Sequence, residues 1–404
     1  MTRFDWIRSA ACAAFGALAV GVMPLVYAQG YTVIQVGQTG YQGNDLNNSG
    51  QVVGMVPDTG SGLPSGFVWS GGTITFLAAP AGTATGLPAG SIGFVSGANA
   101  INTSGQVAGT SSFLGLGGGS TSRASLWSGG SPTLLPPVSG FTASQGFGIN
   151  SSGQVVGFST AGCCSVAPTL WSGGTATNLG TLGGTSGLAF ALNTSGQVVG
   201  MSTITGDTAN HATLWSGGSI IDLGAQRATS INDAGQIVGQ GSFGGATFWN
   251  SSASAPIDLG WGSDASAIAN DLNSGGDVVG MGAIAGSWVR VGSGQGLLWD
   301  GSTTFDLNSL LDVNTWGEWT ITNALAINDL GQILVRGESF LGSSATLLLT
   351  PCTGCSLVDA GLYLERYRFV TGIPEPETYA MLLAGLGLLG WQARRRKLKG
   401  AARA

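Results

Sequence analysis

Charge and histidine are scarce in this sequence. Charged residues make up 8% of the 404 residues, and His211 is the single histidine. Most metal and acid–base sites need more than one such group, and neither H-E-x-x-H nor G-x-S-x-G occurs. A Ser/His/Asp triad needs only one histidine, but a structural histidine at a strand start is the preferred interpretation. We therefore expect no catalytic residue, no metal and no cofactor, and the chain is predicted not to be an enzyme.

Basic residues are nearly absent from the body of the chain. Between Gln29 and Gly372 there are six arginines, no lysine and 17 acidic residues. Phosphate binding needs clustered lysine and arginine, so nucleic acid is excluded as an expected partner. Proline is also sparse, at 13 residues, while glycine reaches 71 without a G-X-Y period. Collagen is therefore excluded, and the composition favours short strands joined by Gly/Ser/Asn turns.

One nine-residue pattern, "LNTSGQVVG" at 192–200, recurs along the chain. Asparagine at the first position and glycine at the fourth of each Asn-x-x-Gly suit a type I turn, so each copy predicts a tight hairpin. Intervals of roughly 40–50 residues are typical of propeller blades or of other repeat arrays. The seven copies begin at Asn47, Asn102, Asn150, Asn193, Asn232, Asn273 and Asn328.

A third strand with a tryptophan follows most copies, and then a short fourth strand. The seventh repeat lacks the fourth strand, and "VIQVG" at 33–37 can supply it. The fold expected for 29–352 is therefore all-β, a seven-bladed β-propeller of four-stranded repeats closed by the N-terminal strand. A β-solenoid is the alternative, but it would need polar caps that the sequence does not display. The tryptophans are Trp69, Trp127, Trp171, Trp215, Trp249 and Trp299.

The loops after the second strands vary, and they share the face opposite the Asn-x-x-Gly turns. Function usually resides on variable loops over a rigid scaffold. The candidate ligand-binding residues on this face are Arg123, His211, Trp288 and Arg290. The alternative is that these loops are spacers.

Four cysteines remain once Cys12 leaves with the predicted leader. An exported compartment is oxidising, so Cys352 and Cys355 are candidates for a small disulfide ring. The state of Cys163 and Cys164 stays open. The turns offer too few carboxylates for calcium, and the cysteines are poorly placed for zinc.

Residues 1–28 have the pattern of a secretory signal. Arg3 and Arg8 precede an apolar stretch at 9–26, and small residues precede a cut after Ala28 by signal peptidase. An uncleaved N-terminal anchor is the alternative.

The C-terminal 374–404 segment follows a predicted linker at 353–373. An apolar helix expected at 378–393 would span about 24 Å, which is short of the ~30 Å hydrocarbon core. It can still insert as a transmembrane helix if the bilayer thins or the arginines snorkel. The basic tail contains Arg394, Arg395, Arg396 and Lys397.

Pro374, Glu375 and Pro376, followed by this helix and tail, resemble a PEP-CTERM sorting signal. The resemblance implies handling by an exosortase in a Gram-negative bacterium that makes exopolysaccharide. The precursor would be anchored in the inner membrane, cut near Pro374–Pro376, and released to the cell surface or matrix. An ordinary membrane anchor is the alternative.

The repeat "LGTLGGTSGLAFALNTSGQVVG" with "HATLW" after it resembles the bacterial extracellular HAF repeat, although Thr213 replaces phenylalanine. This implies a secreted repeat protein and assigns no activity. We expect an exported, non-catalytic binding or structural scaffold with exopolysaccharide or matrix proteins as partners. The alternative is a polysaccharide lyase or hydrolase on the loop face. It would require a convergent set such as Arg290, Glu318, Asp312 and His211.

Overall fold

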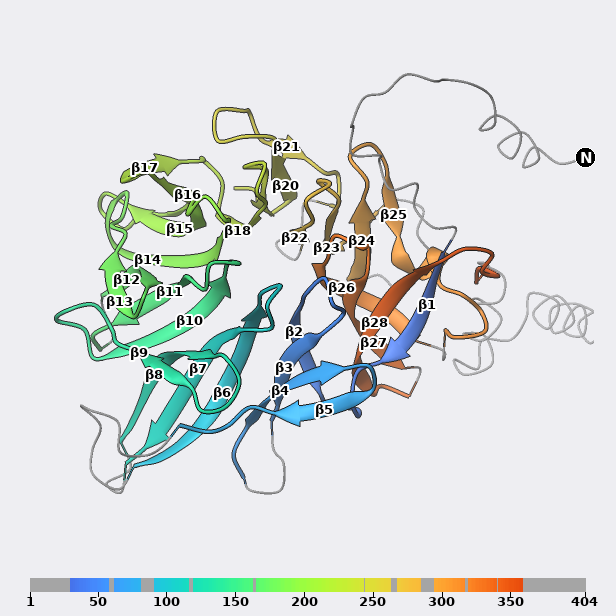
Figure 1. Cartoon of the computed structure of the whole chain (residues 1–404). Helices are drawn as coiled ribbons and strands as arrows, with labels where there is room; N and C mark the ends of the chain where they lie inside the picture. Colours follow the sequence, from blue (N-terminus) through green and yellow to red (C-terminus); the bar gives the residue numbers. More distant parts are fainter. Residues whose placement is uncertain are drawn as a thin grey trace, which may run out of the picture.

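The computed structural model describes residues 30–57, 62–80, 91–115, 119–162, 165–242, 244–262, 267–284, 294–316, 319–339 and 341–358. These residues form 28 strands and one short 3-10 helix, η1 (Leu307–Leu310). The strands build sheets that stand around a common centre (Figure 1). Within the described residues, no helix is long and apolar enough to cross a membrane. The expected signal helix and the expected transmembrane helix at 378–393 both lie outside these residues.

Five sheets have four antiparallel strands each, and in four of them the strand order follows the chain. The first contains β2 (Gln42–Leu46), β3 (Val52–Val56), β4 (Ser65–Ser70) and β5 (Thr73–Phe76), and the next β6 (Ile92–Ile101), β7 (Val107–Leu114), β8 (Ser120–Trp127) and β9 (Thr133–Leu135). Two more contain β18 (Arg227–Ile231), β19 (Ile237–Gln240), β20 (Ala246–Trp249) and β21 (Ile257–Asp258), then β22 (Ile268–Leu272), β23 (Val278–Gly282), β24 (Gln295–Trp299) and β25 (Thr304–Asp306). The last contains β26 (Trp319–Ile327), β27 (Ile333–Ser339), β28 (Ser344–Cys352) and β1 (Gly30–Gln35).

The remaining eight strands form one larger sheet. Its first half is β10 (Ala143–Ile149), β11 (Val155–Thr160), β12 (Val166–Ser172) and β13 (Thr175–Asn178), and its second half is β14 (Gly183–Leu192), β15 (Val198–Ile204), β16 (Asn210–Ser216) and β17 (Ser219–Asp222). A parallel pairing of Val166 with Ser186 joins β12 to β14. The expectation of seven separate four-stranded blades is therefore wrong. The described chain has five four-stranded sheets and one eight-stranded sheet, because this pairing links two repeats.

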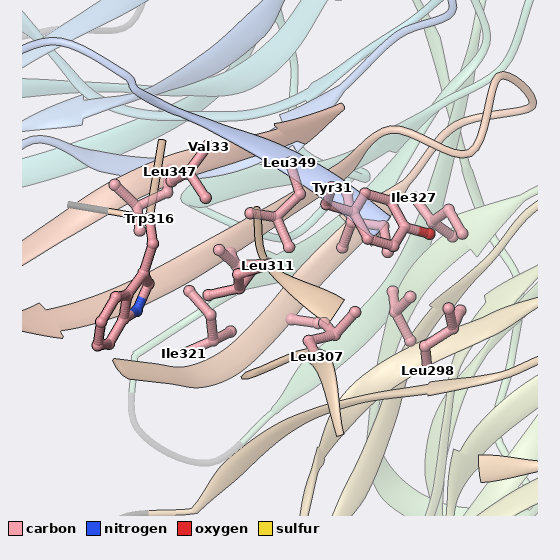
Figure 2. Packing of buried hydrophobic residues seen from close by; sticks show 14 of the residues in the cluster. Tyr31, Val33, Leu298, Leu307, Leu311, Trp316, Ile321, Ile327, Leu347 and Leu349 are labelled. Carbon is pink, nitrogen blue, oxygen red and sulfur yellow. The ribbon is translucent and has the colours of Figure 1, made fainter. Parts of the chain in front are cut away.

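The N-terminal strand closes the array, as predicted. β1 pairs antiparallel with β28, from Gly30 opposite Cys352 to Gln35 opposite Leu347. Tyr31 and Val33 pack into a cluster with Leu347 and Leu349 (Figure 2). Fully burying side chains of this size stabilises the fold by roughly 1.5–3 kcal/mol each. The first and last strands of the body are thus joined by both hydrogen bonds and apolar burial.

Tryptophans of two third strands connect neighbouring repeats. The indole N–H of Trp127 donates to Ala78 O at 2.9 Å, and that of Trp215 donates to Gly180 O at 3.0 Å. Each acceptor lies in the connection that leaves the preceding repeat. These two tryptophans therefore anchor one repeat to the one before it, in addition to filling the core.

A β-bulge interrupts the innermost strand of every repeat at the same place. The register shifts between Gly43 and Asp45, and equivalent shifts occur in the other six repeats. The glycine that ends "QVVG" faces the bulge, and a Cβ at Gly200 would collide with Leu188 O. A bulge leaves one residue unpaired and re-aims its side chain. The seven bulged residues are Asn44, Asn99, Phe147, Phe190, Thr229, Asn270 and Leu325.

Candidate functional site

The seven Asn-x-x-Gly turns form a hydrogen-bonded ring, which we call the asparagine belt. In a representative turn, Asn102 Oδ1 accepts from Gln106 N at 2.9 Å while Asn102 Nδ2 donates to Gln106 Oε1 at 2.8 Å. Asn102 Nδ2 also donates to Asn150 O in the next turn at 3.0 Å. Six of the seven asparagines make this second link, among them Asn328, which donates to Asn47 O at 3.0 Å across the closure. Between the sixth and seventh turns, Ser274 N instead donates to Asp329 Oδ1 at 2.9 Å. The repeated asparagine is thus a buried structural residue.

The turns surround a mouth that opens on one end of the centre, and a cavity of about 360 Å³ lies there. All seven turns line it, so the centre of the array is a channel. The residue after each belt asparagine forms the rim. Two rim residues are acidic, Asp233 and Asp329, and each accepts a backbone N–H from a neighbouring turn.

A second cavity of about 250 Å³, the waist cavity, lies next to the mouth and shares Ile149, Leu192, Ser230, Ile231 and Asp271 with it. It is lined by the bulged residues and by the residues that follow them. Small residues occupy most of the following positions. Repeats one and six carry Asp45 and Asp271 there instead.

Both aspartates tie neighbouring repeats together. Asp45 Oδ2 accepts Ile101 N at 2.8 Å, and Asp271 Oδ2 accepts Ile327 N at 2.9 Å. Asp271 Oδ1 also accepts the hydroxyl of Ser230 at 2.7 Å. These bonds fix the two carboxylates at the wall of the waist cavity.

Burial, together with repulsion from Asp271, raises the pKa of Asp45 to about 7. Burial likewise raises the pKa of Asp271. Both aspartates are half-buried, because part of each residue lies at the surface of the channel. At neutral pH the pair holds a proton part of the time.

Three asparagine side chains in the same layer are held in place by hydrogen bonds from their amide nitrogens. The Nδ2 atoms of Asn44, Asn99 and Asn270 donate to Ala98 O, Gly146 O and Ala324 O at 2.9, 2.6 and 2.8 Å. No hydrogen bond within the described part of the chain uses their Oδ1 atoms. Their oxygens are therefore the acceptors left for a ligand or for water.

The predicted loop-face residues do not converge. Arg123 on β8 donates to Thr142 O at 2.7 Å and to Ser122 O at 2.9 Å, and burial lowers its pKa. His211 on β16 pairs with Asp222 on β17, with Nδ1 2.8 Å from Oδ2. Trp288 and Arg290 lie outside the described residues, as do Cys163, Cys164 and Glu318.

Asp312 belongs to the closure seam and is not part of a pocket with His211. Its backbone N–H donates to Tyr31 O at 2.8 Å, and its Oδ1 accepts Ser356 N at 3.2 Å. Cys352 and Cys355 are joined by a disulfide where β28 ends. The polar groups that the structure does gather are those of the channel, which the sequence reading did not single out. The available signal was "NDLN", which occurs at 44–47 and 270–273 with aspartate where other repeats have small residues.

Comparison with known families identifies the C-terminus. The model of the PEP-CTERM protein-sorting motif matches residues 372–397. The motif implies export, processing by exosortase and sorting to the cell surface. This chain is an exported protein with a β-propeller body and a PEP-CTERM motif. The matched residues, which include Pro374–Pro376 and the arginine cluster, lie outside the described structure.

No curated protein matches the sequence. Several solved structures are similar to this chain at low identity. The β-propeller domain of the Trilobed protease from Pyrococcus furiosus is 9% identical, with a TM-score of 0.34 over 76% of this chain and 81% of that one. A putative TolB from Agrobacterium tumefaciens is 12% identical, with a TM-score of 0.35 over 80% and 98%. A variant of AofleA from Arthrobotrys oligospora is 11% identical, with a TM-score of 0.37 over 68% and 88%. The fold assignment here rests on strand topology.

Proposed function

We propose that the exported body is a non-catalytic binding or structural scaffold of the cell surface or extracellular matrix. The observation that carries the proposal is the asparagine belt together with the β1–β28 closure. In this belt the repeated polar residues hold the ring together. The likeness of the repeats to the HAF repeat supports the same role. Exopolysaccharide or matrix proteins are the proposed partners, since rigid scaffolds commonly present binding surfaces.

The proposed route has three steps. Signal peptidase removes residues 1–28, the C-terminal segment anchors the precursor in the inner membrane of a Gram-negative cell, and exosortase releases it. Alanine at Pro374, Glu375 and Pro376 should leave the protein in the membrane fraction, while the unaltered chain reaches the surface or medium. Equal release of both forms would contradict exosortase handling.

Retention in the matrix tests the scaffold role. Cells lacking the gene should lose matrix cohesion, and the full chain should bind isolated matrix without changing it. Release of new reducing ends or unsaturated sugars by the purified chain would contradict the non-catalytic role.

A second candidate is a polysaccharide hydrolase or lyase. One observation favours it: Asp45 and Asp271 both line the waist cavity, and burial raises the pKa of each, as an acid and base pair requires. Turnover abolished by Asp271→Asn, with binding retained, would support this candidate.

A further inference from the structure

The waist cavity presents acceptors and almost no free donors. The amide nitrogens of Asn44, Asn99 and Asn270, which line this cavity, are committed to backbone carbonyls, so their oxygens are the groups left to accept hydrogen bonds. Asp45 and Asp271 add carboxylate oxygens. Among the described residues that line the waist and the mouth, no side chain is lysine, arginine or histidine. A ligand that fits this lining must supply hydrogen-bond donors and carry no negative charge.

One wall of the same cavity is aromatic. Phe147 and Phe190 are bulged residues of adjacent repeats, both half-buried, with ring centroids 5.9 Å apart. Leu325 extends the apolar lining. A pocket with a few oriented polar groups and an aromatic surface selects ligands that are apolar on one face and polar at the edge.

We propose that the waist cavity binds the chain end of a non-acidic glycan, either neutral or amino-bearing. Sugar hydroxyls donate to the free Oδ1 atoms and the carboxylates, and a sugar C–H face packs on Phe147 and Phe190. An ammonium group on the sugar pairs with Asp45 and Asp271. Uronate or sulfate groups meet two carboxylates and no cation, which disfavours them.

The ligand enters through the mouth, because the two cavities share lining residues from Ile149 to Asp271. Their volumes of about 360 and 250 Å³ admit a chain end, not a folded partner. This inference rests on the proposed function, since it names the ligand class and places it in the channel and not on the loop face.

The test uses the full chain in detergent and measures its affinity for neutral, amino-bearing and uronate oligosaccharides by calorimetry. Thr103→Trp narrows the mouth at an exposed rim position. Thr133→Trp, exposed on the outer strand β9 of the same sheet, is the matched control. We expect at least a tenfold loss for Thr103→Trp and no change for Thr133→Trp. Asp271→Asn should weaken the amino-bearing oligosaccharide more than the neutral one.

Several results would overturn the inference. If Thr103→Trp and Thr133→Trp bind the oligosaccharides with equal affinity, binding occurs outside the channel. The proposed scaffold role would not be affected by that result. Preference for uronates would contradict the charge assignment. Binding of no oligosaccharide by the unaltered chain would overturn the channel site. If that chain also failed to bind isolated matrix, the proposed function would fall with it.

Discussion

The asparagine belt and the bulge layer behind it belong to the same seven inner strands, yet they differ in regularity. Every belt position is asparagine, and six of the seven asparagines donate to the next turn in the same way. In the bulge layer, the same backbone irregularity carries amides, a threonine, two phenylalanines and a leucine. A residue that is the same in all seven repeats is one that the ring structure needs. A position that varies on a fixed backbone is where recognition is built.

The largest effect is expected in the belt. Asn102→Ala removes bonds to Gln106 and Asn150 and leaves buried backbone groups unpaired. We expect a loss of about 2–4 kcal/mol in the free energy of unfolding, measured by urea denaturation. Asn178→Ala is the control, because this exposed side chain caps only Gly180 N. Equal losses for the two variants would remove the structural role of the belt.

A smaller loss is expected in the bulge layer. Asn99→Ala deletes one side-chain bond, that from Nδ2 to Gly146 O at 2.6 Å. The free energy of unfolding should fall by about 1 kcal/mol in the same denaturation series. A loss as large as that of Asn102→Ala would mean that both layers hold the ring, and the contrast between them would fail.

The pH dependence of stability gives a further test of the difference between the asparagine belt and the bulge layer. The pKa of Asp45 is about 7 in the folded chain, above the ordinary value near 4, so the folded chain binds this proton more tightly. Its contribution to stability is therefore present below about pH 4 and is lost as pH rises toward 7. Asp45→Asn should reduce the fall in melting temperature between pH 4.5 and 7.5, by a few degrees at most given the channel water.

The exposed Asp258 supplies the control for this series. Asp258→Asn should reproduce the pH profile of the unaltered chain. If Asp45→Asn also reproduces it, Asp45 titrates in the ordinary acidic range and the waist carries a permanent negative charge.

Much of the fold follows from local sequence rules. Asn-x-x-Gly predicted the hairpins, and the missing fourth strand of the last repeat predicted the pairing of "VIQVG" with the chain's final strand. The link between Val166 and Ser186 could not be predicted, because it depends on how two loops meet in space.

The channel site was also beyond the sequence reading. Strand alternation alone does not reveal that a bulge turns Asn44 and Phe147 toward the axis. Asp45 and Asp271 are 226 positions apart in the chain, and only ring closure makes them neighbours. The loop-face prediction failed to gather a site because Arg123 and His211 each find a separate partner, Thr142 O and Asp222.

Hydrogen–deuterium exchange tests the belt most directly. The Gln332 N–H donates to Asn328 Oδ1 at 2.9 Å beside the closure, and the Gln197 N–H donates to Asn193 Oδ1 at 3.0 Å far from it. A belt that runs unbroken around the channel predicts equal protection of these two amides. Markedly faster exchange at Gln332 would show that the ring opens between its first and last repeats, which would contradict a continuous belt.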